Sequence, residues 1–180
     1  MTLNQYLAIG SLLDSLAPCN FLVFGLGEDS YLWEDINKDG KCVFLEDDKD
    51  WIKKFKDSNL DIRKVNYTTR VQDFELLVEN TEALSLSLPE DIRQTEWDII
   101  LVDAPLGHGP MNTFLSNTKG RPFKGPGRMS SIYEASRLVK KQGIVIVDDL
   151  WRLAESTYAI KYLGDRPINL VENKVGFFRR

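Results

Sequence analysis

Glycines and carboxylates follow several short apolar runs, and these residue types suit ligand binding and proton transfer. Gly25 and Gly27 come directly after the run 21–24, and Glu46 ends the next run, 19 residues after Gly27. Glycines let the backbone turn sharply and approach a ligand closely. A carboxylate at this position, at the end of the next strand, can accept hydrogen bonds from ribose hydroxyls. The two aspartates after Glu46 are instead assigned to the start of a helix. The pattern predicts a nucleoside-containing ligand, with a plain tight turn as the alternative.

The chemistry around the glycines selects among such ligands. A dinucleotide fingerprint has a third glycine where this chain has Ser30. The acidic pair Glu28 and Asp29 disfavours a pyrophosphate. S-Adenosylmethionine, which carries no phosphate, is therefore the predicted cofactor. Tyr67 and Trp51 are candidates to line its adenine pocket; core packing is the alternative for both and is favoured for Trp51.

Three further carboxylates, Asp103, Asp148 and Asp149, follow two later apolar runs. Carboxylates that share one cleft repel each other unless a proton or a cation intervenes. All three are candidate ligands of a divalent cation such as Mg or Mn, and residues 146–151 resemble the corresponding segment of metal-dependent catechol-type O-methyltransferases. Alternatively, Asp103 or Asp149 is a general base that takes a proton from an acceptor hydroxyl. A third interpretation is that Asp149 caps a helix beginning near Trp151.

A long loop, residues 106–127, separates these carboxylates. Together with the residue that follows it, this segment has no Asp or Glu but holds four cations: Lys119, Arg121, Lys124 and Arg128. Arginine pairs bidentately with carboxylates and phosphates. We therefore expect Arg121, Lys124 and Arg128 to bind an anionic acceptor, such as an anionic sugar or a small acid, unless the loop is merely solvated. His108, the only histidine, is a candidate proton shuttle.

Periodicity indicates the elements that must position these residues. Helices are predicted at residues 3–16, 30–37, 48–56, 71–79, 128–141 and 151–163. Buried strands are predicted at 21–24, 42–45, 62–67, 97–102 and 144–147, with an extended piece at 84–88 and a hairpin at 168–171 and 175–178. This alternation predicts an α/β fold: a mostly parallel open sheet, helices on both faces and a C-terminal antiparallel hairpin. The candidate residues then meet at the carboxyl ends of the strands.

Composition narrows the class of protein. A chain of 180 residues fits one domain over residues 1–180, and a net charge of −4 disfavours a nucleic-acid partner. Two cysteines, Cys19 and Cys42, give no disulfide framework and are expected to be buried. No apolar run is long enough to cross a membrane, so no membrane partner is expected. Without a targeting signal, the default location is cytoplasmic.

Several segments, in order, resemble one known family. They are APCNFLVFGLG at 17–27, VFLE at 43–46, VDAP at 102–105 and PGRMSSIY at 126–133. The family is the polysaccharide-biosynthesis domain family of plant glucuronoxylan 4-O-methyltransferases. The resemblance covers roughly residues 15–165.

This resemblance implies a Rossmann-like methyltransferase fold and methyl transfer from S-adenosylmethionine to O4 of glucuronic acid on xylan. It assigns Gly25, Gly27 and Glu46 to the cofactor, places Asp103 near the methyl group and puts Arg128 on the substrate side. Residues 110–124 look inserted relative to the family, and such a loop would select the acceptor. The alternatives are a small-metabolite or peptide acceptor, or a non-catalytic binding module on the same fold.

Overall fold

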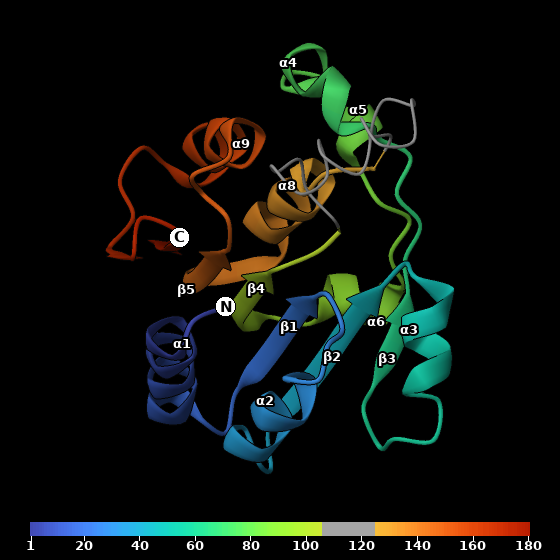
Figure 1. Cartoon of the computed structure of the whole chain (residues 1–180), viewed down its shortest axis with the longest axis vertical. Helices are drawn as coiled ribbons and strands as arrows, with labels where there is room; N and C mark the ends of the chain where they lie inside the picture. The colour runs from blue at the N-terminus through green and yellow to red at the C-terminus, as the bar shows by residue number, and fades with distance from the viewer. Residues whose placement is uncertain (106–124) are drawn as a thin grey trace.

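A seven-stranded sheet in the order β3–β2–β1–β4–β5–β7–β6 forms the centre of the computed structural model, which describes residues 1–105 and 125–180 (Figure 1). Pairing is parallel from β3 to β5, and β7 is antiparallel to both β5 and β6. The strands are β1 (Asn20–Phe24), β2 (Lys41–Glu46), β3 (Ile62–Lys64), β4 (Trp97–Val102), β5 (Val139–Val147), β6 (Asn169–Val171) and β7 (Val175–Arg179). The predicted mostly parallel sheet with a C-terminal hairpin is confirmed.

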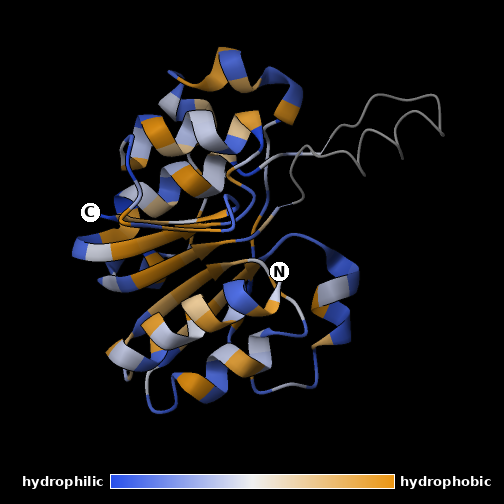
Figure 2. Ribbon diagram, turned by 60° about the vertical axis from the view of Figure 1, so that its left-hand side comes forward, coloured by the Kyte–Doolittle hydropathy of each residue, from blue (hydrophilic) through white to orange (hydrophobic). Residues whose placement is uncertain are grey.

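Helices lie against both faces of this sheet, and the apolar strands run between the two layers (Figure 2). The described helices are α1 (Leu3–Leu16), α2 (Ser30–Ile36), α3 (Lys49–Lys54), η1 (Val71–Asp73), α4 (Phe74–Leu77), α5 (Thr81–Leu84), α6 (Glu90–Gln94), α8 (Met129–Leu138) and α9 (Leu153–Leu163). Within the described ranges, none is long and apolar enough to cross a membrane.

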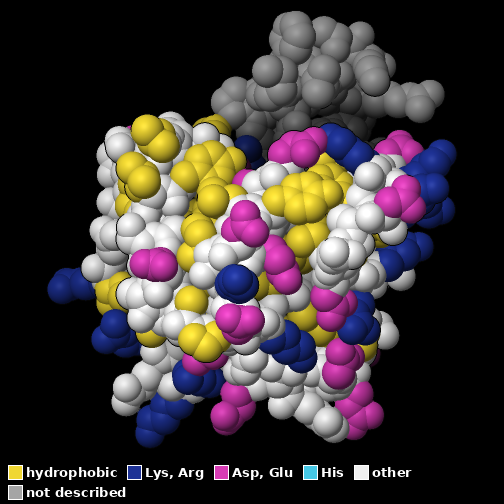
Figure 3. Space-filling view, turned by 90° about the horizontal axis from the view of Figure 1, so that it is seen from below, with side chains coloured by type: hydrophobic (Ala, Val, Ile, Leu, Met, Phe, Trp, Pro, Cys, Tyr) yellow, Lys and Arg dark blue, Asp and Glu magenta, His cyan; other side chains and the backbone are white. Residues whose placement is uncertain are grey.

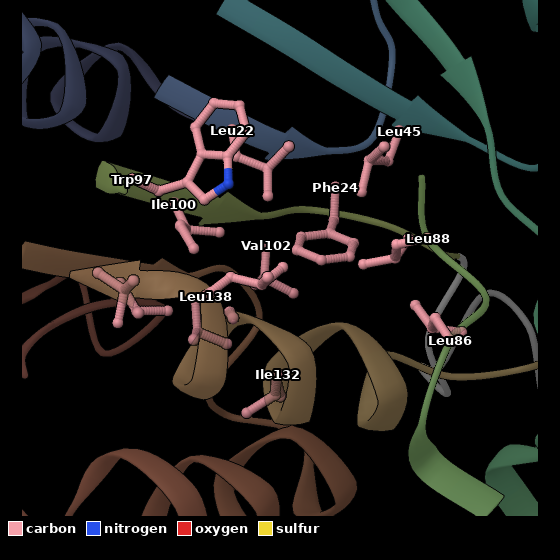
Figure 4. Packing of buried hydrophobic residues seen from close by; sticks show 14 of the residues in the cluster. Leu22, Phe24, Leu45, Leu86, Leu88, Trp97, Ile100, Val102, Ile132 and Leu138 are labelled. Carbon is pink, nitrogen blue, oxygen red and sulfur yellow. The ribbon is translucent and has the colours of Figure 1, made fainter. Parts of the chain in front are cut away.

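The uninterrupted apolar strands supply two separate cores. Side chains alternate across a strand, so Leu22 and Phe24 face one layer while Phe21 and Val23 face the other. The first core lies beneath α8 and α9, where strand side chains meet Ile132 and its neighbours (Figure 4). The second core lies beneath α1 and α2. Burial on both faces explains why these strands show no polar alternation.

The largest differences from the sequence-based prediction lie in two segments. Strand β5 begins at Val139, inside the predicted helix 128–141, and Gly143 lies within that strand. A Cβ on Gly143 would lie 2.9 Å from the carbonyl oxygen of Asp98 on the neighbouring strand, so the close approach of the two backbones requires glycine. Residues 81–96, predicted to include an extended piece, hold the short helices α5 and α6 around an irregular stretch.

The turn between β6 and β7 contacts two distant parts of the chain. Glu172 accepts hydrogen bonds from Thr2 Oγ1 (2.7 Å), Asn4 Nδ2 (2.9 Å) and Gln5 Nε2 (2.8 Å), all at the start of α1. Two residues later, Lys174 reaches the end of β5. The hairpin thereby joins the N-terminal helix to the carboxyl edge of the sheet.

Both cysteines are buried and unbonded to each other, as predicted. Asn37 lies beside them: its Oδ1 accepts from the Cys19 N–H at 2.9 Å, and its Nδ2 lies 3.2 Å from Cys42 Sγ. Burial raises the pKa of the Cys19 thiol to about 11 and that of Cys42 to about 12. These thiols therefore stay protonated and act as small apolar side chains.

We predict that Ile100→Ala lowers the free energy of unfolding by about 3 kcal/mol, because it removes buried methyl groups from the central strand. Ile100 is 0% exposed, whereas Ile160 on α9 is 57% exposed and provides the matched control, Ile160→Ala. Urea unfolding of both variants measures the difference. Equal, small losses in the two variants would contradict this description of the core.

Candidate active site

A cavity of about 380 Å³ opens at the carboxyl ends of the parallel strands. Its position is set by topology, because the strand order reverses between β1 and β4, and such a reversal leaves a crevice beyond the strand ends. The cavity is lined by Val23, Gly25, Leu26, Gly27, Asp29, Ser30, Trp33, Glu46, Asp47, Asp48, Trp51, Leu101, Asp103, Ala104, Pro105, Pro126 and Arg128. The structure therefore brings both predicted glycines, Glu46, Asp103 and Arg128 to one place.

The glycine turn has the tight geometry that its sequence predicts. Gly25 has a φ of +132°, and a Cβ there would lie 3.2 Å from the Cβ of Ala104. A Cβ on Gly27 would lie 2.5 Å from Asp29 Oδ1. Both glycines therefore let the backbone pass close to neighbouring groups at the rim of the cavity.

Glu46 holds the glycine turn against the end of β2. Its carboxylate is 5% exposed and accepts from the N–H groups of Leu26 (2.9 Å), Asp47 (2.8 Å) and Asp48 (2.8 Å). Burial raises its pKa, and these backbone donors oppose the rise. A carboxylate has about four acceptor positions, so the three backbone bonds leave about one for a ligand hydroxyl.

The helix after Glu46 is capped as predicted by one of the two following aspartates. Asp48 Oδ1 accepts from the N–H groups of Asp50 (2.7 Å) and Trp51 (3.3 Å). Asp48 therefore caps this helix, and Glu46 does not take part in the cap.

Asp103 is the carboxylate most exposed to the cavity among the three at the ends of β4 and β5. Its N–H donates to the carbonyl of Phe24 at 3.0 Å, and its side chain is about one-third exposed at 32%. Burial raises the pKa of Asp103 to about 7; the Arg128 cation opposes this rise and the Asp148 carboxylate adds to it. A carboxyl that titrates near neutral pH can accept and release a proton under physiological conditions.

Arg128 is buried, contrary to its predicted role in gripping an acceptor. It is 5% exposed, and its Nη1 and Nη2 groups bond within the protein to the residues at the ends of β4 and β5. Nη1 lies 3.1 Å from Asp149 Oδ2, and Nη2 lies 3.1 Å from Asp103 Oδ1. The structure therefore gives Arg128 an internal role, because its guanidinium is already occupied by protein oxygens.

Two more cations surround the β5 carboxylates. Arg152 Nη2 lies 2.9 Å from Asp149 Oδ2, and Lys174 Nζ lies 3.3 Å from Asp148 Oδ1. Burial by itself would raise the pKa of Asp148, but Arg128, Asp103 and Lys174 outweigh it and lower that pKa. Asp148 is therefore held in its charged form.

The predicted divalent-cation site does not fit this arrangement. Each of Asp103, Asp148 and Asp149 already pairs with at least one protein cation, and residues 1–105 and 125–180 contain no group of three side chains suited to a metal. Asp149 also does not cap the following helix. That helix begins at Leu153 with Arg152 at its cap position.

The two aromatic candidates exchange their expected roles. Tyr67 packs against the first core, and its hydroxyl lies 3.0 Å from Ser131 Oγ, so it does not line the cavity. Trp51, for which core packing was favoured, is 37% exposed and lines the cavity. Its ring stacks on Phe55 with centroids 5.9 Å apart.

Three predicted residues, His108, Arg121 and Lys124, lie outside the described residues. Among the described ones, sequence reasoning missed Asp29, which lines the cavity, and Lys174, which contacts the β5 carboxylates. The position of Asp29, two residues after Gly27, could have identified it as a lining residue from sequence. No local pattern identifies Lys174, because it reaches the site only through the hairpin.

The described lining of the cavity is strongly acidic. Asp29, Glu46, Asp47, Asp48 and Asp103 contribute carboxyl groups, whereas Arg128 is the one cation among the described lining residues. Acidic and basic side chains are interspersed over the face of the molecule shown in Figure 3. Such a lining favours a cationic ligand over a phosphate.

The topology, glycine turn and Glu46 define a Rossmann-like domain of the methyltransferase fold class. A solved structure described as a ribosomal RNA methyltransferase from Plasmodium falciparum shares this fold, with a TM-score of 0.52 and 13% identity over 99% of this chain and 95% of that one. At that identity the likeness concerns the fold alone.

The chain belongs to the IRX15/IRX15L/GXM family, which it matches over residues 5–86 and 82–179. It is 38% identical to glucuronoxylan 4-O-methyltransferase 2 of Arabidopsis thaliana, over 84% of this chain and 56% of the relative. It is 35% identical to arabinogalactan O-methyltransferase 1 of the same plant, over 85% and 57%. The chain thus spans little more than half the length of these relatives, and the family resemblance seen in the sequence is confirmed.

We predict that the stabilities of the wild type and of Asp103→Asn diverge with pH. Between about pH 4 and 7 the folded protein keeps a proton on Asp103 that the unfolded chain has lost, because the pKa rises from 3.8 to about 7 on folding. The contribution of this proton to the free energy of unfolding is complete at low pH and is lost as the pH rises through the folded pKa.

The free energy of unfolding of the wild type, minus that of Asp103→Asn, should therefore fall from pH 4 to 7 and level off above about pH 8. Urea unfolding across this range measures it. Asp57→Asn, at an exposed position, is the control for the effect of an Asp-to-Asn substitution itself. A difference that grows with pH would show that the Asp103 pKa is lowered instead.

Proposed function

We propose that this chain forms the catalytic domain of an S-adenosylmethionine-dependent O-methyltransferase that acts on a polysaccharide hydroxyl. The observation that carries the proposal is the juxtaposition, in one cavity, of a glycine turn, a buried Glu46 and the partly exposed carboxyl of Asp103. The names of the relatives support the same class of reaction.

The cavity lining suits this cofactor on three grounds. Gly25 and Gly27 place backbone without side chains in the cavity lining, Glu46 keeps about one acceptor position for a ribose hydroxyl, and the acidic lining suits a ligand with a positive sulfonium and ammonium. Trp51 offers an apolar ring at the rim. The cofactor supplies an activated methyl group; these residues would bind and orient it.

Asp103 is the proposed base. It faces the cavity, and a pKa near neutral lets its carboxylate take the proton that an acceptor hydroxyl releases on methylation. The remaining contribution of the protein is to align acceptor and methyl group, since correct orientation alone supplies much of the rate of such a transfer. No metal is needed for this scheme.

The proposed acceptor is a uronic-acid residue of a plant-type cell-wall polysaccharide. Similar identities to relatives named for glucuronoxylan and for arabinogalactan support a polysaccharide, and leave two substrates to compare directly. Parallel assays with the two polymers and with free uronic acids would distinguish them. Transfer to small acids alone would contradict a polymer acceptor.

We predict that S-adenosylhomocysteine binds the protein and that Glu46→Gln weakens this binding by about tenfold or more, because one charged acceptor in the cavity is lost. Calorimetric titration measures both affinities. Glu82→Gln, at an exposed position, is the matched control and should bind like the wild type. Absence of binding to the wild type would remove the cofactor assignment.

We also predict that Asp103→Asn lowers kcat for methyl transfer by about 100-fold or more, since an amide cannot take the proton. Radiolabelled methyl transfer to glucuronoxylan measures the rate, with Asp57→Asn as the control. Binding of S-adenosylhomocysteine should change far less than kcat. Full activity in Asp103→Asn would overturn the assignment of this base and favour a non-catalytic role for the carboxyl.

A further inference from the structure

A buried guanidinium joins the ends of two neighbouring strands of the sheet. Arg128 Nη2 donates to the carbonyl of Asp103 at 2.7 Å, and Nη1 donates to the carbonyl of Asp148 at 2.8 Å. Asp103 follows β4 and Asp148 follows β5, whose backbones also bond through the Asp148 N–H to the Val102 carbonyl at 3.1 Å. The guanidinium extends the connection between the strands beyond this ladder.

The same guanidinium also holds side chains on both strands. Nη2 lies 3.1 Å from Asp103 Oδ1, and Nη1 lies 3.1 Å from Asp149 Oδ2. Asp149 has a φ of +61°, an unusual conformation for a residue with a side chain. Its charged contacts with Arg128, Arg152 and Lys174 accompany this conformation and fix the turn after β5.

Asp103 is consequently fixed at three points. Its N–H bonds to Phe24 on β1, its carbonyl bonds to Arg128, and its carboxylate pairs with the same arginine. The oxygen of Asp103 that makes the ion pair with Arg128 is Oδ1. The direction of the carboxyl in the cavity therefore depends on Arg128, from the N-terminal end of α8, together with the neighbouring carboxyl of Asp148, which Arg128 also holds.

We propose that Arg128 is a positioning residue, which holds Asp103 in its working orientation by tying the ends of β4 and β5 together and does not contact the acceptor. This inference rests on the proposed function, in which Asp103 takes the hydroxyl proton. It assigns a role to the distinctive PGRMSSIY segment, where the sequence had placed an acceptor-binding arginine.

The planar guanidinium is essential to this role. It presents donors in a fixed fork that reaches two carbonyls at once, whereas the single ammonium of lysine is a point charge on a flexible stem. Arg128→Lys thus keeps the charge near the three carboxylates but loses the bridge. Arg166→Lys, at an exposed position before β6, is the matched control.

In Arg128→Lys we expect kcat to fall by about 100-fold, because small displacements of reacting groups have effects of this size. KM for glucuronoxylan and the affinity for S-adenosylhomocysteine should stay within about twofold, since Arg128 is not expected to bind either. Backbone hydrogen exchange should rise in peptides covering 100–105 and 144–149, and not elsewhere. Arg166→Lys should match the wild type in every measurement.

A second variant covers the case in which Arg128→Lys does not fold. Arg128→Met combined with Asp149→Asn removes one cation and one carboxylate, so the charge balance of the buried cluster is preserved. The same fall in kcat and the same local exchange are expected from it, and its folding is checked by thermal melting.

A rise in the KM for glucuronoxylan with kcat unchanged would overturn the proposal and return Arg128 to acceptor binding. Unchanged hydrogen exchange at both strand ends would overturn it independently of any assay. If the wild type transfers no methyl group to any acceptor, the proposed function fails, and the exchange measurement still decides whether Arg128 fixes the strand ends.

Discussion

Burial of one guanidinium among three carboxylates is the constraint on which the carboxyl edge of this sheet depends. Taking such charges out of water costs several kcal/mol per ion, and good geometry with additional hydrogen bonds is required to offset it. Arg128 meets this requirement with two carbonyl bonds and ion pairs to Asp103 and Asp149. The strand ends and the helix that carries Arg128 must therefore keep one fixed arrangement.

Residues far apart in sequence converge to satisfy that constraint. Arg128 comes from the start of α8, Asp103 from the end of β4, and Lys174 from the turn of the C-terminal hairpin. The same turn anchors the start of α1 through Glu172. Antiparallel addition of β7 beside β5 is thus part of the site, because it delivers a cation to the carboxylates there.

Carboxylates in three different environments result, and these environments separate their roles. Asp148 is surrounded by cations that lower its pKa, whereas burial dominates at Asp103 and raises its pKa to about 7. Glu46 differs again, since backbone N–H groups occupy most of its acceptor positions. The cavity therefore holds a group that exchanges a proton near neutral pH and a group that fixes the glycine turn, while Asp148 lies buried behind it with a lowered pKa.

The sequence by itself determined the strand pattern, the glycine turn and the clustering of carboxylates at one edge, because these follow from local periodicity and from the rule that parallel strands end together. Local pattern also predicted the C-terminal hairpin and an aspartate at the start of the helix after Glu46, Asp47 or Asp48, of which the structure selects Asp48. Only the tertiary structure decided which carboxylates pair with Arg128, which aromatic ring faces the cavity, and that Lys174 reaches β5. Those outcomes depend on desolvation and on distances between remote segments, which the spacing of residues along a chain does not encode.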